Sequence, residues 1–308
     1  MKPSREAFVA KTLVVFGSSS DRDYSFLAPI TALFWREVVG FEPLVFLVGT
    51  EAEWRAKPDA CVVLDGLRLH DVGVCFTGNE MGDFPIGTIA QHVRYHAAAD
   101  SAIAEDRWVM MTDADLWPLR GYFYQAHTKP DAMGKLAVCY YSNGDHFKSK
   151  EDVLEGFRDC RPFQSIPTCH VTMRACEWRT VYDLIPDDVL GSTRVTLKDV
   201  AEWVKRYPDP NFALWCSDQW LVAEHLCRQA WFPDAALMIP RYGHPPTDRL
   251  DRSAPNDWRV PFEMKYTDAH LLKKPHEEGA WGCLLPIIDT LLPDQAAWAR
   301  EYREAFVR

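Results

Sequence analysis

The sequence lacks a segment long and apolar enough to cross a membrane. Its longest uncharged, largely apolar stretch, residues 24–35, has twelve residues, whereas a membrane-spanning helix needs about 20. Near the N-terminus, the apolar run at residues 12–16 is shorter than the roughly 7–15 residues of a signal-peptide core. We therefore predict a soluble, cytoplasmic protein with no signal peptide and no membrane span.

Paired-cysteine and glycosylation motifs are also missing. The nine cysteines are odd in number and include no C-x-x-C pair, which argues against both a disulfide framework and a zinc ribbon. No N-x-[S/T] sequon occurs. We expect reduced thiols in a cytosol-like compartment.

Positive charge is in deficit. Lys and Arg number 34 against 44 Asp and Glu, which makes the formal net charge −10. An acidic chain disfavours a nucleic-acid coat or a binder of anionic membranes, so a nucleic-acid acceptor is not expected, although a local basic cleft remains compatible with this charge. Hydrophobic residues make up 47% and charged residues 25%, as in ordinary soluble globular proteins.

The chain alternates strand-like and helix-like segments, which predicts an α/β fold with a mostly parallel, mixed central sheet flanked by helices. Predicted strands are 12–16, 43–48, 61–64, 72–76, 108–111, 136–141 and 170–173. Predicted helices are 24–39, 86–103, 175–184, 200–207, 218–229 and 293–307, and residues 233–293 are interpreted as covering loops. We predict a single domain over 1–308, with a first half at 12–135, a second half at 136–292 and a C-terminal helix at 293–308.

Two carboxylates follow the apolar strand at 108–111, in the sequence Asp113-Ala114-Asp115. Residues at i and i+2 of a strand point the same way, and ligands bind outside the carboxyl ends of strands in open α/β sheets. Converging carboxylates repel each other unless a cation lies between them, which favours Mg²⁺ or Mn²⁺. The alternative is an ordinary strand-ending turn, in which Asp is common.

The order of a strand with a Ser-rich loop, a second strand, a helix and then a strand with D-x-D resembles the nucleotide-sugar-dependent glycosyltransferases of the GT-A fold, over residues 12 to 276. This resemblance implies a GT-A, Rossmann-like fold and a hexosyl- or pentosyltransferase (EC 2.4) active in glycan biosynthesis. It implies a nucleotide-diphosphate sugar donor, most often UDP, and a glycan or other hydroxyl acceptor. By resemblance, Asp113 faces the ribose and the metal, Ala114 belongs to the donor site, and Asp115 ligates Mn²⁺ or Mg²⁺ directly.

The loop after the first strand is rich in small residues, which allow a base and ribose to approach the backbone. In GT-A enzymes this loop binds the nucleoside, so the resemblance implies a donor role for Gly17, Ser18, Ser19, Ser20 and Asp21. Tyr24 is a candidate for stacking on the base. A generic loop with a helix N-cap is the alternative.

Near the C-terminus, the sequence His270-Leu-Leu-Lys273-Lys274-Pro partly resembles the His…Gly…Lys-Pro-Trp element of glycogenin and related retaining galactosyltransferases. The resemblance implies that His270 is the third metal ligand and that Lys273 or Lys274 contacts the diphosphate. A metal and an ammonium group both suit a departing diphosphate. The Gly and Trp of that element are missing, and a surface histidine beside solvated lysines is the alternative.

The segment Trp215-Cys-Ser-Asp218-Gln219-Trp220 places an acid among aromatic residues, at the start of a predicted helix. It resembles the Asp-Gln on the acceptor side of many GT-A enzymes, which implies that Asp218 and Gln219 are catalytic. Asp218 would be the general base of an inverting enzyme or would lie by the anomeric carbon of a retaining one. Helix capping is the alternative.

Four further residues have weaker support. Arg94 is a candidate donor contact, and His170, Trp215 and Trp220 are candidates for the acceptor side. Two other functions remain open: a sugar-phosphate nucleotidyltransferase, although the first loop lacks the Gly-rich pattern with Arg and Lys of those enzymes, and a non-catalytic nucleotide-sugar-binding protein.

Overall fold

The structure is a computed structural model. It describes residues 11–78, 84–127, 134–141, 149–160, 166, 168–240, 249–253, 257–259 and 266–308. No helix in these ranges is long and apolar enough to cross a membrane.

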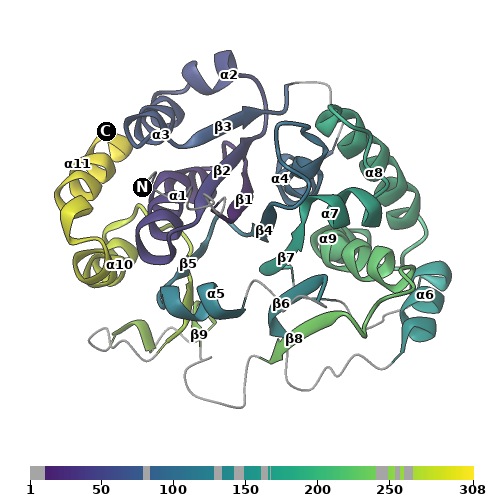
Figure 1. Ribbon diagram of the computed structural model, residues 1–308. Helices are drawn as coiled ribbons and strands as arrows, with labels where there is room; N and C mark the ends of the chain where they lie inside the picture. The colour runs from purple at the N-terminus through teal and green to yellow at the C-terminus, as the bar shows by residue number, and fades with distance from the viewer. Residues whose placement is uncertain are drawn as a thin grey trace, which may run out of the picture.

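A mixed sheet of seven strands forms the centre of the molecule (Figure 1). Across the sheet the strands are β3 (Gly73–Phe76), β2 (Glu42–Leu47), β1 (Leu13–Ser18), β4 (Trp108–Thr112), β7 (His170–Arg174), β6 (Leu136–Tyr141) and β8 (Ala236–Pro240). The pairs from β3 to β4 are parallel, as is β6 with β8, whereas β7 runs antiparallel to both of its neighbours. The predicted mixed α/β sheet is confirmed.

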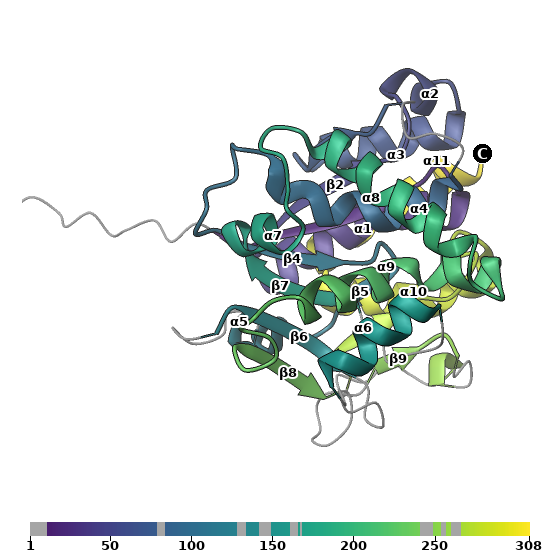
Figure 2. The same cartoon turned by 90° about the vertical axis from the view of Figure 1, so that its right-hand side faces the viewer.

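Helices cover both faces of this sheet (Figure 1). One layer contains α1 (Arg22–Leu33), the π-helical turn Phe34–Val39, α3 (Pro58–Leu69), α10 (Glu278–Leu291) and α11 (Ala296–Val307). The other contains α4 (Ile86–Val93), the 3-10 turn Arg94–Ala99, α7 (Ala175–Val181), α8 (Val189–Val204) and α9 (Pro210–Cys227). Figure 2 shows α4, α8 and α9 in front of the sheet. Shorter helices are α2 (Glu51–Arg55), α5 (Gly121–His127) and α6 (Lys150–Asp159), with 3-10 turns at Asp257–Arg259 and Pro293–Gln295.

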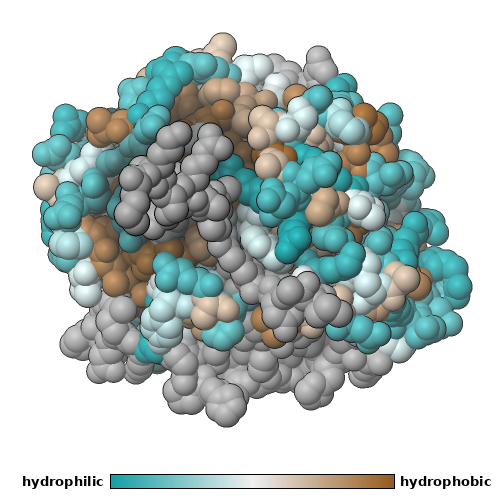
Figure 3. Space-filling view, viewed as in Figure 1, coloured by the Kyte–Doolittle hydropathy of each residue, from teal (hydrophilic) through white to brown (hydrophobic). Residues whose placement is uncertain are grey.

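The hydrophobic core is divided by the sheet. A cluster that includes Trp178, Trp203 and Trp220 lies under α7 to α9. A second cluster, which includes Phe26, Trp281 and Phe306, lies among α1, α3, α10 and α11. On the face drawn in Figure 3, hydrophilic side chains predominate over the half that carries α8 and α9, and hydrophobic ones occupy smaller areas there.

A second, three-stranded sheet lies beside the first and contributes to the site. It consists of β5 (Leu116–Pro118), β10 (Asp268–His270) and β9 (Arg249–Asp251), with β10 antiparallel to β5 and parallel to β9. The strand β5 begins directly after Asp115, so this sheet continues the chain of β4 after a turn. It brings residues near 250 and 270 to the end of β4.

Three sequence-based predictions of local structure are wrong. Residues 61–64 lie in α3 and do not form a strand. The segment 233–293, interpreted as loops, contains β8, β9, β10 and the 14-residue helix α10. Asp218 does not begin a helix, because α9 begins at Pro210, where the side chain of Asp209 caps it by accepting bonds from Asn211 N–H and Phe212 N–H.

Candidate functional site

A cavity of about 540 Å³ opens where β1 and β4 end. In the sheet, β2 and β3, which follow β1 in the sequence, lie on one side of these two strands, and β7 and β6, which follow β4 in the sequence, lie on the other side. Such a switch point at the carboxyl ends of strands is where open α/β sheets bind ligands. The predicted site residues that line the cavity are Gly17, Ser19, Tyr24, Arg94, Asp113, Ala114, Asp115, Trp215, Asp218, Gln219 and His270.

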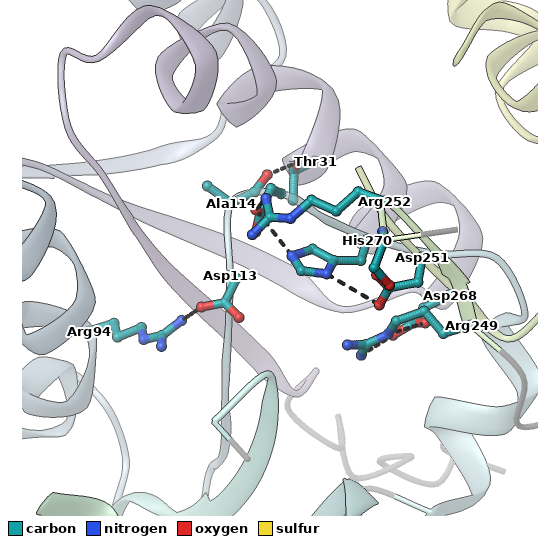
Figure 4. Close-up of polar contacts among 11 residues, drawn as sticks. Thr31, Arg94, Asp113, Ala114, Arg249, Asp251, Arg252, Asp268 and His270 are labelled. Carbon is teal, nitrogen blue, oxygen red and sulfur yellow. Dashed lines mark hydrogen bonds and ion pairs between the residues drawn. The ribbon is translucent and has the colours of Figure 1, made fainter. Parts of the chain in front are cut away.

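The turn that carries Asp113 and Asp115 is anchored by its backbone. The Thr31 hydroxyl donates a hydrogen bond of 2.6 Å to the Ala114 carbonyl (Figure 4), and Leu271 N–H donates one of 2.9 Å to the Asp115 carbonyl. Residues 113–115 lie between β4 and β5, outside both strands. The alternation of side chains along a strand therefore does not apply, and the two carboxylates bind different arginines from different elements.

Arg94 is a buried cation shared by two carboxylates. Its guanidinium forms an ion pair with Asp113 (Figure 4), and its Nη2 lies 2.9 Å from Asp218 Oδ2. The Arg94 residue is 1% exposed and Asp218 is 3% exposed. Despite the opposing effect of burial, the charges of Asp113, Tyr95 and Asp218 raise the pKa of Arg94, which therefore stays protonated.

Asp218 presents one carboxylate oxygen without a partner. Oδ2 accepts bonds from Arg94 and, at 3.0 Å, from the Thr168 hydroxyl, whereas buried Oδ1 has no hydrogen-bond partner among the described residues. Burial raises the pKa of Asp218. A buried acceptor without a partner is unfavourable by about 1–3 kcal/mol. The Asp218 residue lines the cavity.

Asp115 lies between two cationic side chains. Arg252 Nη1 is 2.7 Å from Asp115 Oδ2, and His270 Nε2 is 3.4 Å from the same oxygen. On its other side, His270 Nδ1 is 3.4 Å from Asp251 Oδ2 (Figure 4). Although burial opposes it, bonding to Asp115 and Asp251 raises the pKa of His270 to about 9. Although burial opposes it, hydrogen bonds from His270 and Ser253 hold the pKa of Asp251 well below its usual range.

The three predicted metal ligands do not converge on one point. Asp115 and His270 are close, but Asp113 is paired with Arg94. Within the described ranges, no group of three or more His, Cys, Asp or Glu side chains is arranged to hold a metal ion. As arranged here, these residues do not fit a divalent ion, and the metal role of Asp113, Asp115 and His270 stays a prediction.

In the loop after β1, some residues line the cavity and others make only local contacts. Gly17 is required by packing, because a Cβ at this position would lie 1.9 Å from the Ala90 carbonyl oxygen. Ser18 and Ser19 are buried, and Ser19 lines the cavity. Ser20 lies outside it and accepts a bond of 2.8 Å from Lys57 Nζ. Asp21 is the N-cap of α1, accepting from Asp23 N–H.

Tyr24, on α1, lies at the cavity wall close to the charged groups. Burial raises the pKa of its hydroxyl, as does the negative charge of Asp115, while Arg252 acts in the opposite direction. The tyrosine therefore stays protonated and can donate a hydrogen bond near Asp115. Its proposed stacking on a base stays a prediction.

Three further predicted residues also lie outside the cavity. His170 is buried and bridges Asp268 Oδ2, at 3.0 Å, and the Thr112 hydroxyl, at 3.2 Å, which ties β7 to β10 and β4. Trp220 is buried at 4% exposure and packs edge-on against Trp203. Lys274 is exposed and paired with Glu277.

Lys273 and Trp215 lie at the edges of the site. Lys273 lines a second hollow that shares Arg252 and His270 with the cavity. Trp215 is 56% exposed and also lines the cavity. Both side chains are therefore accessible to a ligand that extends out of the cavity.

The sequence interpretation missed Asp251 and Arg252, which lie in the region read as loops. Asp251 is the last residue of the strand β9 and Arg252 directly follows it. The N–H of Arg252 donates a hydrogen bond of 3.0 Å to the His270 carbonyl. The alternation of charged and apolar residues in Arg249-Leu250-Asp251 is shorter than the roughly four to eight residues that indicate a strand, so it could not have revealed β9.

The arrangement of sheet, helices and cavity is the GT-A glycosyltransferase fold. The chain is similar to the galactosyltransferase LgtC, solved with donor and acceptor sugar analogues, at a TM-score of 0.50 and 13% identity, over 96% of each chain. This likeness establishes the fold alone.

Two other solved structures are similar at lower scores. They are the bifunctional glycosyltransferase WbbM (TM-score 0.49, 10% identity, 97% of this chain and 52% of that one) and GlyE of Streptococcus pneumoniae (TM-score 0.48, 12% identity, 93% and 64%). No protein-family model and no curated protein sequence matches this chain.

Proposed function

We propose that this protein is a glycosyltransferase that moves a sugar from a nucleotide-diphosphate donor to an acceptor hydroxyl. The observation that carries the proposal is Asp218, a buried residue that lines the cavity and whose Oδ1 has no hydrogen-bond partner among the described residues. Sugars offer hydroxyl donors to such an oxygen. The fold supports the same class, because LgtC has this fold.

The chemistry of transfer fits the groups around the cavity. The bond between the anomeric carbon and the phosphate oxygen breaks, and a bond between that carbon and the acceptor oxygen forms. The acceptor proton passes to a base, and the nucleoside diphosphate leaves as an anion. Burial raises the pKa of Asp218, which moves a carboxylate toward the range of an effective general base.

We assign the two ends of the cavity to the two substrates. The donor lies at Ser19, which follows β1, at Tyr24 on α1 and at the turn 113–115, which follows β4. The acceptor lies toward Trp215, whose exposed ring offers a flat apolar surface to the C–H face of a sugar. UDP-hexoses are the first donors to test, followed by UDP-pentoses. The predicted Mn²⁺ or Mg²⁺ is not part of this proposal.

Release of nucleoside diphosphate from a panel of nucleotide sugars tests the proposal. The panel contains UDP-, GDP-, ADP- and CDP-sugars, each supplied with a mixture of simple glycosides as acceptors. We expect release with one nucleoside class, and a loss of at least about 100-fold in Asp218→Asn, the size of effect typical for removing a general base. Asp106→Asn is the matched control, because Asp106 is exposed and outside the cavity.

Two results would contradict the proposal. One is the absence of release from every donor in the panel. The other is an Asp218→Asn variant as active as the unchanged protein. Formation of pyrophosphate from a nucleoside triphosphate and a sugar 1-phosphate would instead support the sugar-phosphate nucleotidyltransferase alternative.

A further inference from the structure

Each carboxylate of the Asp113-Ala114-Asp115 turn already has a guanidinium partner. Arg94 pairs with Asp113 (Figure 4), and Arg252 Nη1 lies 2.7 Å from Asp115 Oδ2. The repulsion between two neighbouring carboxylates is the electrostatic reason for expecting a divalent ion beside them. Here two arginines from separate elements, the turn after α4 and the end of β9, remove that reason.

Arg252 is held in place by the small sheet. Its N–H donates to the His270 carbonyl at 3.0 Å, directly after the paired residues Asp251 and His270. Three residues earlier in the chain, Arg249 forms a bidentate pair with buried Asp268, at 2.8 and 2.6 Å. This ion pair fixes β9 against β10, so the position of Arg252 is set by the fold and its side chain is only 20% exposed.

The Arg252 guanidinium has hydrogen-bonding capacity left for a ligand. A guanidinium has five N–H donors, and the contacts of Arg252 in the described ranges are with Asp115 and Tyr24. Arg252 also lines the cavity, on the same wall as the 113–115 turn. Arginine binds phosphate oxygens in a bidentate manner, and a fixed cation stabilises charge that develops on a leaving group.

We propose that Arg252 binds the diphosphate of the donor in the position that a divalent cation would take, so that donor binding does not require a metal ion. This inference rests on the proposed function, because the diphosphate is that of the nucleotide-sugar donor. In the transfer step, Arg252 contacts the β-phosphate whose oxygen separates from the anomeric carbon. Asp115 then acts as a positioning residue that orients the guanidinium.

Calorimetric titration with nucleoside diphosphates tests this inference. UDP, GDP, ADP and CDP are each titrated in EDTA and in Mn²⁺, into the unchanged protein and into three variants. Arg252→Met removes the charge with little loss of side-chain length. Arg252→Lys keeps a point charge but loses the bidentate geometry. Arg300→Met is the matched control, because Arg300 pairs with Asp289 on the surface of α11.

We expect the unchanged protein to bind one nucleoside diphosphate with a Kd in EDTA within threefold of that in Mn²⁺. Arg252→Met should weaken this binding in EDTA by at least tenfold, Arg252→Lys by less, and Arg300→Met not at all. The thermal midpoint of each variant without ligand checks that it folds. The comparison of EDTA with Mn²⁺ on the unchanged protein needs no variant.

Two results would overturn the inference: binding that appears only with Mn²⁺, or an Arg252→Met variant that binds in EDTA as tightly as the unchanged protein. In both cases a nucleoside diphosphate still binds, so the proposed function stands while this role of Arg252 fails. If no nucleoside diphosphate binds in either buffer, both the proposed function and this role are refuted.

Discussion

Arg94→Met should destabilise the fold, because it removes the arginine that pairs with the buried carboxylate of Asp218. Asp218 is 3% exposed and its Oδ2 lies 2.9 Å from Arg94 Nη2. Removing one partner of a buried ion pair destabilises a protein by about 3–5 kcal/mol. The Asp113 side chain is 34% exposed, so losing that pair adds at most about 1 kcal/mol. We expect a loss near 3 kcal/mol, since Asp218 can bind a proton when its partner is gone.

Urea unfolding followed by circular dichroism measures this loss. The double variant Arg94→Met, Asp218→Asn carries no buried charge at this position, so it should recover about 2 kcal/mol relative to Arg94→Met alone. Arg158→Met is the control, because the Arg158 side chain is 69% exposed and pairs with exposed Asp159. A loss below about 1 kcal/mol in Arg94→Met, or no recovery in the double variant, would refute the reasoning.

Three further predictions follow from packing and burial. Gly17→Ala should lower the free energy of unfolding by more than about 2 kcal/mol, measured in urea, because its Cβ would lie 1.9 Å from the Ala90 carbonyl; a neutral result would contradict the close approach of α4. Trp220→Ala should destabilise by about 3–5 kcal/mol, whereas Trp215→Ala, at a position 56% exposed, should change stability by less than about 0.5 kcal/mol and raise the acceptor KM; equal thermal shifts for both would contradict this. Burial lowers the pKa of His96 to about 3, so the unfolded chain binds a proton below pH 6.5 that the folded chain does not, and stability falls as the pH drops. His96→Phe should therefore remove about 2 kcal/mol of the loss between pH 7.5 and pH 5, and unchanged pH dependence would contradict it.

The parallel half of the fold was predictable because its strands are short, apolar and closed by turn residues. The strand predicted at 43–48 appears as β2 (Glu42–Leu47), and the strand at 108–111 as β4 (Trp108–Thr112). The prediction for 61–64 failed because a four-residue apolar run does not distinguish a strand from one face of a helix. Pro58, at the first position of α3, was the signal of a helix start.

The second half was harder to predict because its elements depend on tertiary contacts. The strands β9 and β10 have three residues each and pair across 16 residues of intervening chain. Pro286 lies inside α10. Proline disfavours the interior of a helix, so the local sequence argued against α10, which is stabilised by packing. Asp218 was correctly placed among aromatic residues, but its position within α9 depends on a cap at Asp209, nine residues earlier.

Only the part of the site that depends on local sequence could be predicted. The turn at 113–115 followed from a buried strand ending in polar residues, and it does line the cavity. The pairing of each carboxylate with an arginine could not be predicted, because Arg94 and Arg252 are 19 and 137 residues away in sequence. Only the folded sheets bring these charges together.

A crystal structure with the nucleoside diphosphate that the titrations identify, grown at a concentration well above its Kd, tests the central claim most directly. The account predicts the nucleoside against Ser19 and Tyr24, and the diphosphate beside Arg252 in the cavity at the ends of β1 and β4. A nucleotide bound at any other surface, with this cavity empty, would contradict the assignment of the cavity as a sugar-donor site.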